Sequence, residues 1–148
     1  MTEQKFIVGG EWRTGSVSMT VKNPYTNADI GQVSLAAKEQ LVEAILAAQR
    51  AFLITSKYSS YERSEILQSV VAQLRIQKEE FAQLITAEAG KPMMFSRAEV
   101  DRAISTFEIA AEEAKRISGE TIPLDISKGT KGKLGIVNSF PIGIILCI

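Results

Sequence analysis

The most constraining feature of this sequence is the apolar run at residues 142–148, which reads IGIILCI. Apart from Gly143, every position is apolar, and polar and apolar residues do not alternate. Such a run is typical of a β-strand covered on both faces, as in a parallel sheet, and not of a strand with one face in water. Both faces need helices and neighbouring strands, which no following residues supply. We therefore expect the front part of a larger α/β protein.

The composition excludes several classes of partner. Apolar residues make up 45% of the 148 residues and charged residues 23%, as in ordinary globular proteins. The 17 basic and 17 acidic residues cancel, so we predict neither nucleic acid nor a membrane surface as a partner. No segment approaches the roughly 18 apolar residues of a membrane helix, and no signal peptide is evident. One cysteine cannot form an internal disulfide, so we expect the reducing cytoplasm.

Few side chains could carry catalysis. The sequence contains no histidine, which removes the commonest general base and metal ligand. Cys147 lies inside the apolar run, with no histidine or helix N-terminus beside it to favour the thiolate. We therefore predict that Cys147 is a buried packing residue and not a nucleophile.

The first 34 residues predict short antiparallel strands. Residues 6–13 predict a hairpin around Gly9 and Gly10, because glycine tolerates the positive φ angles of a tight turn. A second pair of strands is expected at residues 19–22 and 30–34, joined by turn residues. Neither pair has enough apolar surface to fold alone.

Three amphipathic helices are predicted next. The first covers about residues 38–54 and presents one apolar face, formed by Leu41, Ile45, Ala48 and Phe52. The second begins at the capping box Ser59–Glu62 and ends at Gly90, which suits a left-handed C-cap. The third begins at a similar box, Ser96–Glu99, and ends at Gly119.

Beyond the helices, residues 128–133 predict a polar, glycine-rich turn between two strands. The spacing of Gly129, Gly132 and Gly135 differs from the dinucleotide-binding fingerprint, and no helix follows to meet a phosphate. Pro141 cannot donate to a sheet ladder, so it separates this hairpin from the terminal run.

In this order and spacing, the segments resemble the N-terminal part of the NAD(P)-dependent aldehyde dehydrogenase superfamily. The matching residues are Phe6–Trp12, Asn23–Thr26, the predicted helix from Lys38 to Phe52, Glu88–Pro92 and Pro141–Ile145. Each segment alone is weakly diagnostic, whereas their joint order across the chain is specific.

The resemblance implies an α/β subunit built from small antiparallel strands, three amphipathic helices, oligomerisation strands and the first Rossmann-like strand. Residues 1–122 would form the front part of the cofactor-binding domain. Residues 123–140 would be a strand pair through which the protein forms a homo-oligomer. Residues 141–148 would be the first strand of the Rossmann-like sheet, truncated there.

The resemblance also implies oxidation of an aldehyde to a carboxylic acid with NAD or NADP, through a cysteine nucleophile and a glutamate base. None of the family's catalytic residues matches a position here, so we predict no catalytic residue and an inactive isolated chain. Ile148 leads into the family's cofactor-lining loop and is the one predicted cofactor contact. Glu88 and carbonyls near Val21 match a monovalent-cation site of some members, but one carboxylate is too little, and we predict no metal site.

Alternative functions stay open. Residues 115–123 resemble a branch that handles small polar aldehydes such as lactaldehyde, glyceraldehyde with or without its phosphate, and succinate semialdehyde. Alternatively, the chain is a non-catalytic assembly or interaction module, or the remnant of a disrupted dehydrogenase gene, with an unpaired apolar strand open to a partner. A three-helix binding domain is a third reading, which leaves the terminal run unexplained.

Overall fold

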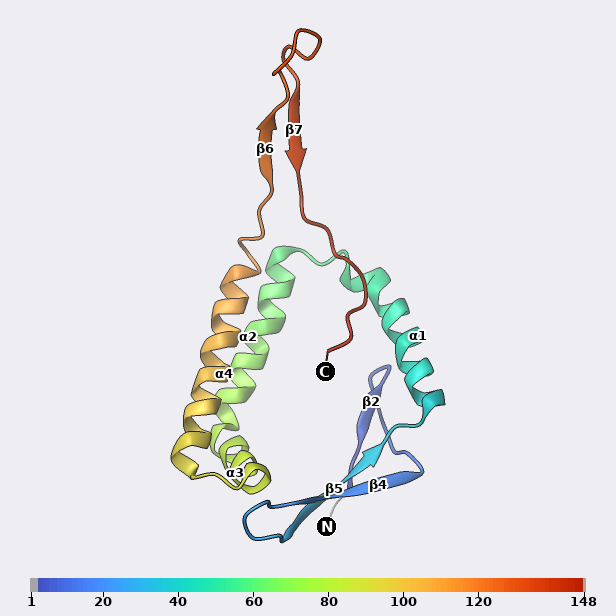
Figure 1. The fold of residues 1–148 in the computed structure, drawn as a ribbon, viewed down its shortest axis with the longest axis vertical. Coiled ribbons are helices and arrows are strands. Elements are labelled where there is room, and N and C mark those ends of the chain that lie inside the picture. The colour runs from blue at the N-terminus through green and yellow to red at the C-terminus, as the bar shows by residue number, and fades with distance from the viewer. Residues whose placement is uncertain (1–2, 148) are drawn as a thin grey trace.

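The computed structural model describes residues 3–147. Figure 1 shows an elongated molecule with a column of helices on one side, a further helix opposite, small sheets at one end and a projecting hairpin at the other. The elements in chain order are β1 (Glu3–Gln4), β2 (Phe6–Val8), β3 (Glu11–Arg13), β4 (Val17–Lys22), β5 (Asp29–Leu35), α1 (Lys38–Thr55), α2 (Ser60–Ile76), α3 (Lys78–Ala89), α4 (Met93–Glu113), β6 (Glu120–Pro123) and β7 (Leu134–Val137).

The two predicted N-terminal hairpins are confirmed. β2 and β3 pair antiparallel around Gly9 and Gly10, whose φ angles are +61° and +89°. β4 and β5 also pair antiparallel, and β1 adds to β5 in parallel, so the sheet order is β1-β5-β4. The β4–β5 turn is held by Asn23 Oδ1, which accepts hydrogen bonds from the backbone N–H groups of Tyr25 and Thr26, both over 2.9 Å.

The helical column contains the core. Val71 of α2, Ala82 of α3, and Val100 and Ile104 of α4 form the buried apolar cluster. The prediction of one helix from residue 60 to Gly90 is wrong, because the chain breaks at Gln77, with φ −99° and ψ 14°. The apolar periodicity runs through the break, so the sequence hides it. The break lets α2 and α3 each pack against α4.

The predicted bounds of the third helix are also wrong. α4 begins at Met93, directly after Pro92, and ends at Glu113. Ser96, expected as the N-cap, lies fully buried inside the helix. Proline suits a helix start because it has no N–H to leave unpaired. Gly119 does not end the helix; a Cβ there would lie 2.0 Å from the carbonyl oxygen of Val137, so its role is a close backbone approach.

α1 packs differently from the prediction. Its main contacts are with β2. The Cβ of Ala47 lies 3.5 Å from the position that a Cβ on Gly9 would take. No residue of α1 is fully buried, and Leu41 and Ile45 of the predicted apolar face are exposed. The helix therefore packs mainly through small side chains, and Phe52 is its one large apolar side chain that is partly buried.

The predicted hairpin around residues 128–133 is confirmed, since β6 and β7 pair antiparallel on either side of it. β6 begins at Glu120, three residues before the expected start of this segment at residue 123. The turn is closed by the backbone N–H of Thr130, which donates to the carbonyl oxygen of Ser127 over 3.0 Å.

Residues 141–147 form no strand, and all of them except Gly143 are exposed. Ile142 is 90% exposed and Leu146 78% exposed, so the apolar run is left uncovered within residues 3–147. Cys147 is exposed as well, so its predicted burial is wrong for this chain. The physical reason is that a strand needs a hydrogen-bonded neighbour, and residues 3–147 place none beside this segment. A place in a Rossmann-like sheet stays a prediction.

Candidate functional site

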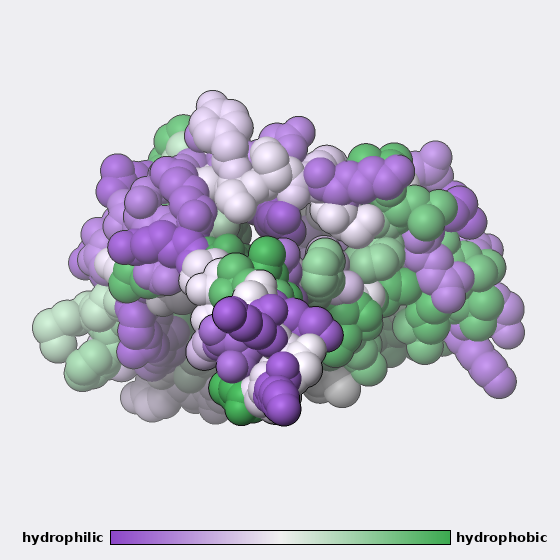
Figure 2. All heavy atoms as spheres, turned by 90° about the horizontal axis from the view of Figure 1, so that it is seen from above, coloured by the Kyte–Doolittle hydropathy of each residue, from purple (hydrophilic) through white to green (hydrophobic). Residues whose placement is uncertain are grey.

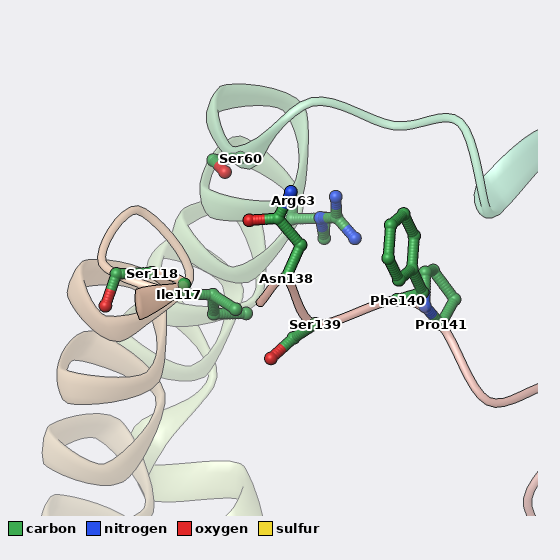
Figure 3. A pocket seen from close by; sticks show the side chains of 9 residues that line it. Ser60, Arg63, Ile117, Ser118, Asn138, Ser139, Phe140 and Pro141 are labelled. Atoms are coloured by element: carbon green, nitrogen blue, oxygen red, sulfur yellow. The ribbon is translucent and has the colours of Figure 1, made fainter. Parts of the chain in front are cut away.

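The one predicted cofactor contact, Ile148, lies outside the described residues 3–147. Residues 138–141, which precede the terminal apolar run, line a cavity of about 460 Å³ at the base of the projecting hairpin (Figure 3). Its walls come from the start of α2, the connection from α4 to β6, and the residues after β7. They comprise Ser60, Arg63, Ile117, Ser118, Gly119, Asn138, Ser139, Phe140 and Pro141.

Arg63 is the one ionisable side chain of this cavity. Its Nη2 donates to the carbonyl oxygen of Tyr58 over 2.5 Å. Its Nε is buried and has no hydrogen-bond partner among residues 3–147. In Figure 3 the guanidinium extends toward Phe140. The polar groups around it are hydroxyls and one amide, so the cavity carries net positive charge.

The side chains that line this cavity are suited to binding a polar group. The lining contains no cysteine, carboxylate or lysine that could act as nucleophile or general base. Its donors could hold a carbonyl or an anionic group, since a guanidinium donates hydrogen bonds through its N–H groups and cannot accept any.

Across residues 3–147, no group of three or more cysteine or carboxylate side chains is close enough to hold a metal ion. Val21 and Glu88 do line one cavity of about 650 Å³, together with Glu80. The lining thus contains two carboxylates, which by themselves do not make a defined ligand set. No helix in this part of the chain is long and apolar enough to cross a membrane.

The carboxyl groups whose pKa values are lowered make hydrogen bonds or ion pairs that stabilise the fold. The backbone N–H of Ser59 donates to Glu62 and lowers the pKa of its carboxyl group, which completes the predicted capping box. Arg97 lowers the pKa of Glu79 by a two-pronged hydrogen bond, with distances of 3.0 and 2.7 Å. Lys91 lowers the pKa of Glu99 through a 2.6 Å contact.

The fold of residues 3–147 is of the mixed α/β class found at the N-terminus of larger enzyme subunits. The sequence model described as "Aldehyde dehydrogenase family" matches residues 12–148. The chain therefore belongs to the aldehyde dehydrogenase family, which confirms the resemblance seen in the sequence.

Three relatives illustrate the match. The 3-sulfolactaldehyde dehydrogenase of Priestia aryabhattai is 37% identical over 141 residues, covering 95% of this chain and 29% of that protein. Aldehyde dehydrogenase 21 from Physcomitrella patens, solved with its reaction product succinate, is 41% identical with a TM-score of 0.86, covering 90% of this chain and 28% of that one. NADP-dependent glyceraldehyde-3-phosphate dehydrogenase from Bacillus halodurans, solved with NADP, is 26% identical with a TM-score of 0.87. The match covers 93% of this chain and 30% of that one.

The chain thus spans less than a third of the length of these relatives. The α/β fold class is confirmed as the N-terminal part of such subunits. The boundaries at residues 122 and 140 and the cofactor contact of Ile148 stay predictions. The cavity around Arg63 was missed by sequence reasoning, because its walls come from three separate parts of the chain.

Proposed function

We propose that this chain is the N-terminal part of an NAD(P)-dependent aldehyde dehydrogenase that oxidises a small polar aldehyde to its carboxylic acid. The observation that carries the proposal is the family match over residues 12–148 together with the close structural likeness to aldehyde dehydrogenase 21. In this reaction a cysteine thiolate adds to the aldehyde carbon, hydride passes from that carbon to the nicotinamide to leave a thioester, and water then cleaves the thioester to release the acid and the thiol. Those steps would fall to residues beyond this chain.

The proposed substrate is a small aldehyde carrying an anionic or hydroxyl group. The names of the relatives support this class, since one is named for 3-sulfolactaldehyde and another was solved with succinate. The resemblance of residues 115–123 to a branch for small polar aldehydes points the same way. We propose NAD or NADP as the cofactor, because a structural relative was solved with NADP.

The proposed role of this segment is to build the subunit and to assemble it. The β6–β7 hairpin projects away from the rest of the chain (Figure 1), and its Leu134 and Ile136 are exposed. An exposed hairpin with apolar side chains suits pairing with another subunit. We therefore propose a homo-oligomer through residues 123–140, in the cytoplasm.

The decisive experiment starts from the coding sequence after Ile148. If the reading frame continues, the whole product is purified and the formation of NADH and NADPH is measured with lactaldehyde, 3-sulfolactaldehyde and succinate semialdehyde. Reduction of one cofactor by at least one aldehyde is expected. A long product that reduces neither cofactor with any of them would contradict the proposal.

The alternative is a non-catalytic assembly module, a role that the exposed apolar side chains of the β6–β7 hairpin would also suit. A stop codon directly after Ile148 would support that alternative. Calorimetric titration of the 148-residue chain with NAD and NADP adds a second measurement. We expect no binding heat, and micromolar affinity would show that a cofactor site lies within this chain.

A further inference from the structure

Arg63 is a cation for which residues 3–147 provide no counter-charge. None of the ion pairs in this part of the chain includes it. The preceding carboxylate, Glu62, accepts hydrogen bonds from the backbone N–H and the hydroxyl of Ser59, both over 2.7 Å, so it serves the start of α2. Arg63 Nε is buried without a partner among the described residues. Buried polar groups are normally hydrogen-bonded, so this guanidinium is suited to an acceptor from outside the chain.

The cavity around Arg63 surrounds the guanidinium with neutral polar groups. Three hydroxyl groups and one carboxamide line it, from Ser60, Ser118, Ser139 and Asn138. In the view of Figure 3 the guanidinium lies between Asn138 and Phe140. Hydroxyl and amide groups can donate hydrogen bonds to an anion without changing the charge of the site. The lining therefore presents a single positive charge among further donors.

Asn138 reaches the cavity through a close backbone approach. A Cβ on Gly119 would lie 2.0 Å from the carbonyl oxygen of Val137 and 2.5 Å from Asn138 Oδ1. Glycine thus lets the segment after β7 run against the connection from α4 to β6. The hydroxyls and the carboxamide of the lining belong to exposed residues, whereas Arg63 is half-buried. A solute can therefore enter from the solvent and meet the charge at the inner wall.

The other walls and the size of the cavity favour a small organic anion. Ile117, Phe140 and Pro141 add apolar surface beside the polar groups. Figure 2, which looks down on the projecting hairpin, shows hydrophobic and hydrophilic residues side by side around it. The volume of about 460 Å³ lies within the range of about 300–1,000 Å³ typical of small-molecule sites.

The single positive charge selects among anions. A carboxylate carries one negative charge at neutral pH and matches the planar fork of a guanidinium. A phosphate carries nearly two, and the second would have no cation in this lining.

We propose that the cavity around Arg63 is a binding site for a small monocarboxylate that bears a hydroxyl group. Arg63 holds the carboxylate, and Asn138 and the serine hydroxyls hydrogen-bond to its oxygens and to the ligand hydroxyl. The inference goes beyond the proposed function and does not rest on it, since it uses only side chains of this chain. With one half-buried cation, the dissociation constant should be millimolar.

The test is an NMR titration of the ¹⁵N-labelled 148-residue chain with glycolate, at an ionic strength kept constant with sodium chloride. The Nε–H signal of Arg63, assigned by its loss in Arg63→Lys, reports the site directly. A saturable shift of this signal is expected. Glycolamide has nearly the same shape without the charge and should give none. Inorganic phosphate should bind more weakly than glycolate.

Two variants test the lining, with backbone amide shifts as the readout. Arg63→Lys keeps the charge but loses the fork, so binding of glycolate should weaken at least about tenfold. Because Arg63 also donates to the carbonyl oxygen of Tyr58, Asn138→Ala provides a second variant that leaves α2 intact, and it should weaken binding about threefold. The matched control is Arg116→Gln, which removes the same charge from a guanidinium that pairs with Glu113 over 3.0 Å outside the cavity. It should bind glycolate like the parent chain.

The proposal would be overturned by the lack of a saturable shift with glycolate, or by glycolamide or phosphate binding at least as tightly as glycolate. An unchanged affinity in Asn138→Ala would also overturn it, since the carboxamide would then not contact the ligand. The readout is binding and not aldehyde oxidation, so the result is independent of the NADH and NADPH assay of the longer product.

Discussion

Two serine hydroxyls in the helical column differ in how their hydrogen bonds are satisfied. Ser64 of α2 and Ser96 of α4 are both fully buried. Ser96 Oγ is hydrogen-bonded to Thr86 Oγ1 over 2.8 Å, which links α4 to α3. Ser64 Oγ has no partner in the described part of the chain. A buried hydroxyl without a partner costs about 1–3 kcal/mol, so Ser64 weakens the column that Ser96 strengthens.

Replacing each serine by alanine should therefore have opposite effects. Ser64→Ala is expected to raise the free energy of unfolding by about 1 kcal/mol, because it removes an unsatisfied group. Ser96→Ala is expected to lower it by about 1 kcal/mol, because it breaks a hydrogen bond and leaves Thr86 with one partner fewer. Both changes replace a helical serine by alanine and so improve helix propensity equally. The difference between the two variants in urea denaturation therefore reports the hydrogen bonding of the two hydroxyls. Equal shifts in the same direction would contradict this account.

The capping box of α2 should make stability depend on pH. The hydrogen bonds from Ser59 lower the pKa of Glu62 in the folded chain. The unfolded chain therefore binds more protons, and the contribution is present above the unfolded pKa and lost as the pH falls through the folded value. Urea midpoints measured between about pH 6 and about pH 3 should fall less steeply for Glu62→Gln, which keeps an acceptor but cannot titrate. The same pH slope in both proteins would rule out this contribution.

At the scale of elements, the end of α3 joins the helical column to the β4–β5 hairpin. Gly90 caps α3 in the left-handed conformation, with φ +64°, and its N–H donates to the carbonyl oxygen of Thr86 over 2.9 Å. A Cβ on Gly90 would lie 3.0 Å from Cγ of Pro24. Asn23 Nδ2 donates to the carbonyl oxygen of Ala87 over 2.8 Å, so the turn holds this helix end directly.

Gly90→Ala should therefore be costly. The left-handed conformation costs a residue with a Cβ about 1–2 kcal/mol, and the contact with Pro24 adds crowding. We expect the free energy of unfolding to fall by at least about 1 kcal/mol in urea denaturation. The matched control is Gly129→Ala in the β6–β7 turn, where a Cβ meets nothing within 4 Å. A similar loss in both variants would mean that neither backbone conformation nor crowding at Gly90 matters.

At the scale of the whole molecule, the exposed apolar side chains of α1 and of residues 142–147 limit the area that folding can bury. An unfolded chain of this mass exposes about 23,500 Å², so folding to 11,405 Å² removes a smaller area than a compact fold would. The central core spans the three packed helices, whereas α1 touches mainly β2. Cooperative unfolding should therefore involve mainly the helical column of α2, α3 and α4.

The denaturant dependence should show this directly. The m value in urea scales with the surface exposed on unfolding, so it should be about three quarters of that of a compact protein of equal length. The measurement is urea denaturation followed by circular dichroism at several protein concentrations. An m value equal to that of a compact protein would show that α1 and residues 142–147 are covered in solution.

The sequence predicted the N-terminal hairpins, the Ser59–Glu62 box, the Gly90 cap and the turn at residues 128–133. Each depends on interactions between residues close in the chain, such as the N–H of Ser59 and the carboxyl group of Glu62. The order of these signals also predicted the family and the α/β class correctly. Of the candidate site, it did not predict the cavity around Arg63, whose walls come from separate parts of the chain.

Only the tertiary structure decided the break at Gln77, the start of α4 at Met93, the alanine side of α1 as its packing face, and the exposure of residues 141–147. These features depend on which distant elements meet, and the energy of such contacts is absent from local patterns. The sequence shows that a side chain is apolar but does not show whether a neighbour covers it. The sequence therefore determined which segments are apolar, and the three-dimensional arrangement determined which of them are buried within this chain.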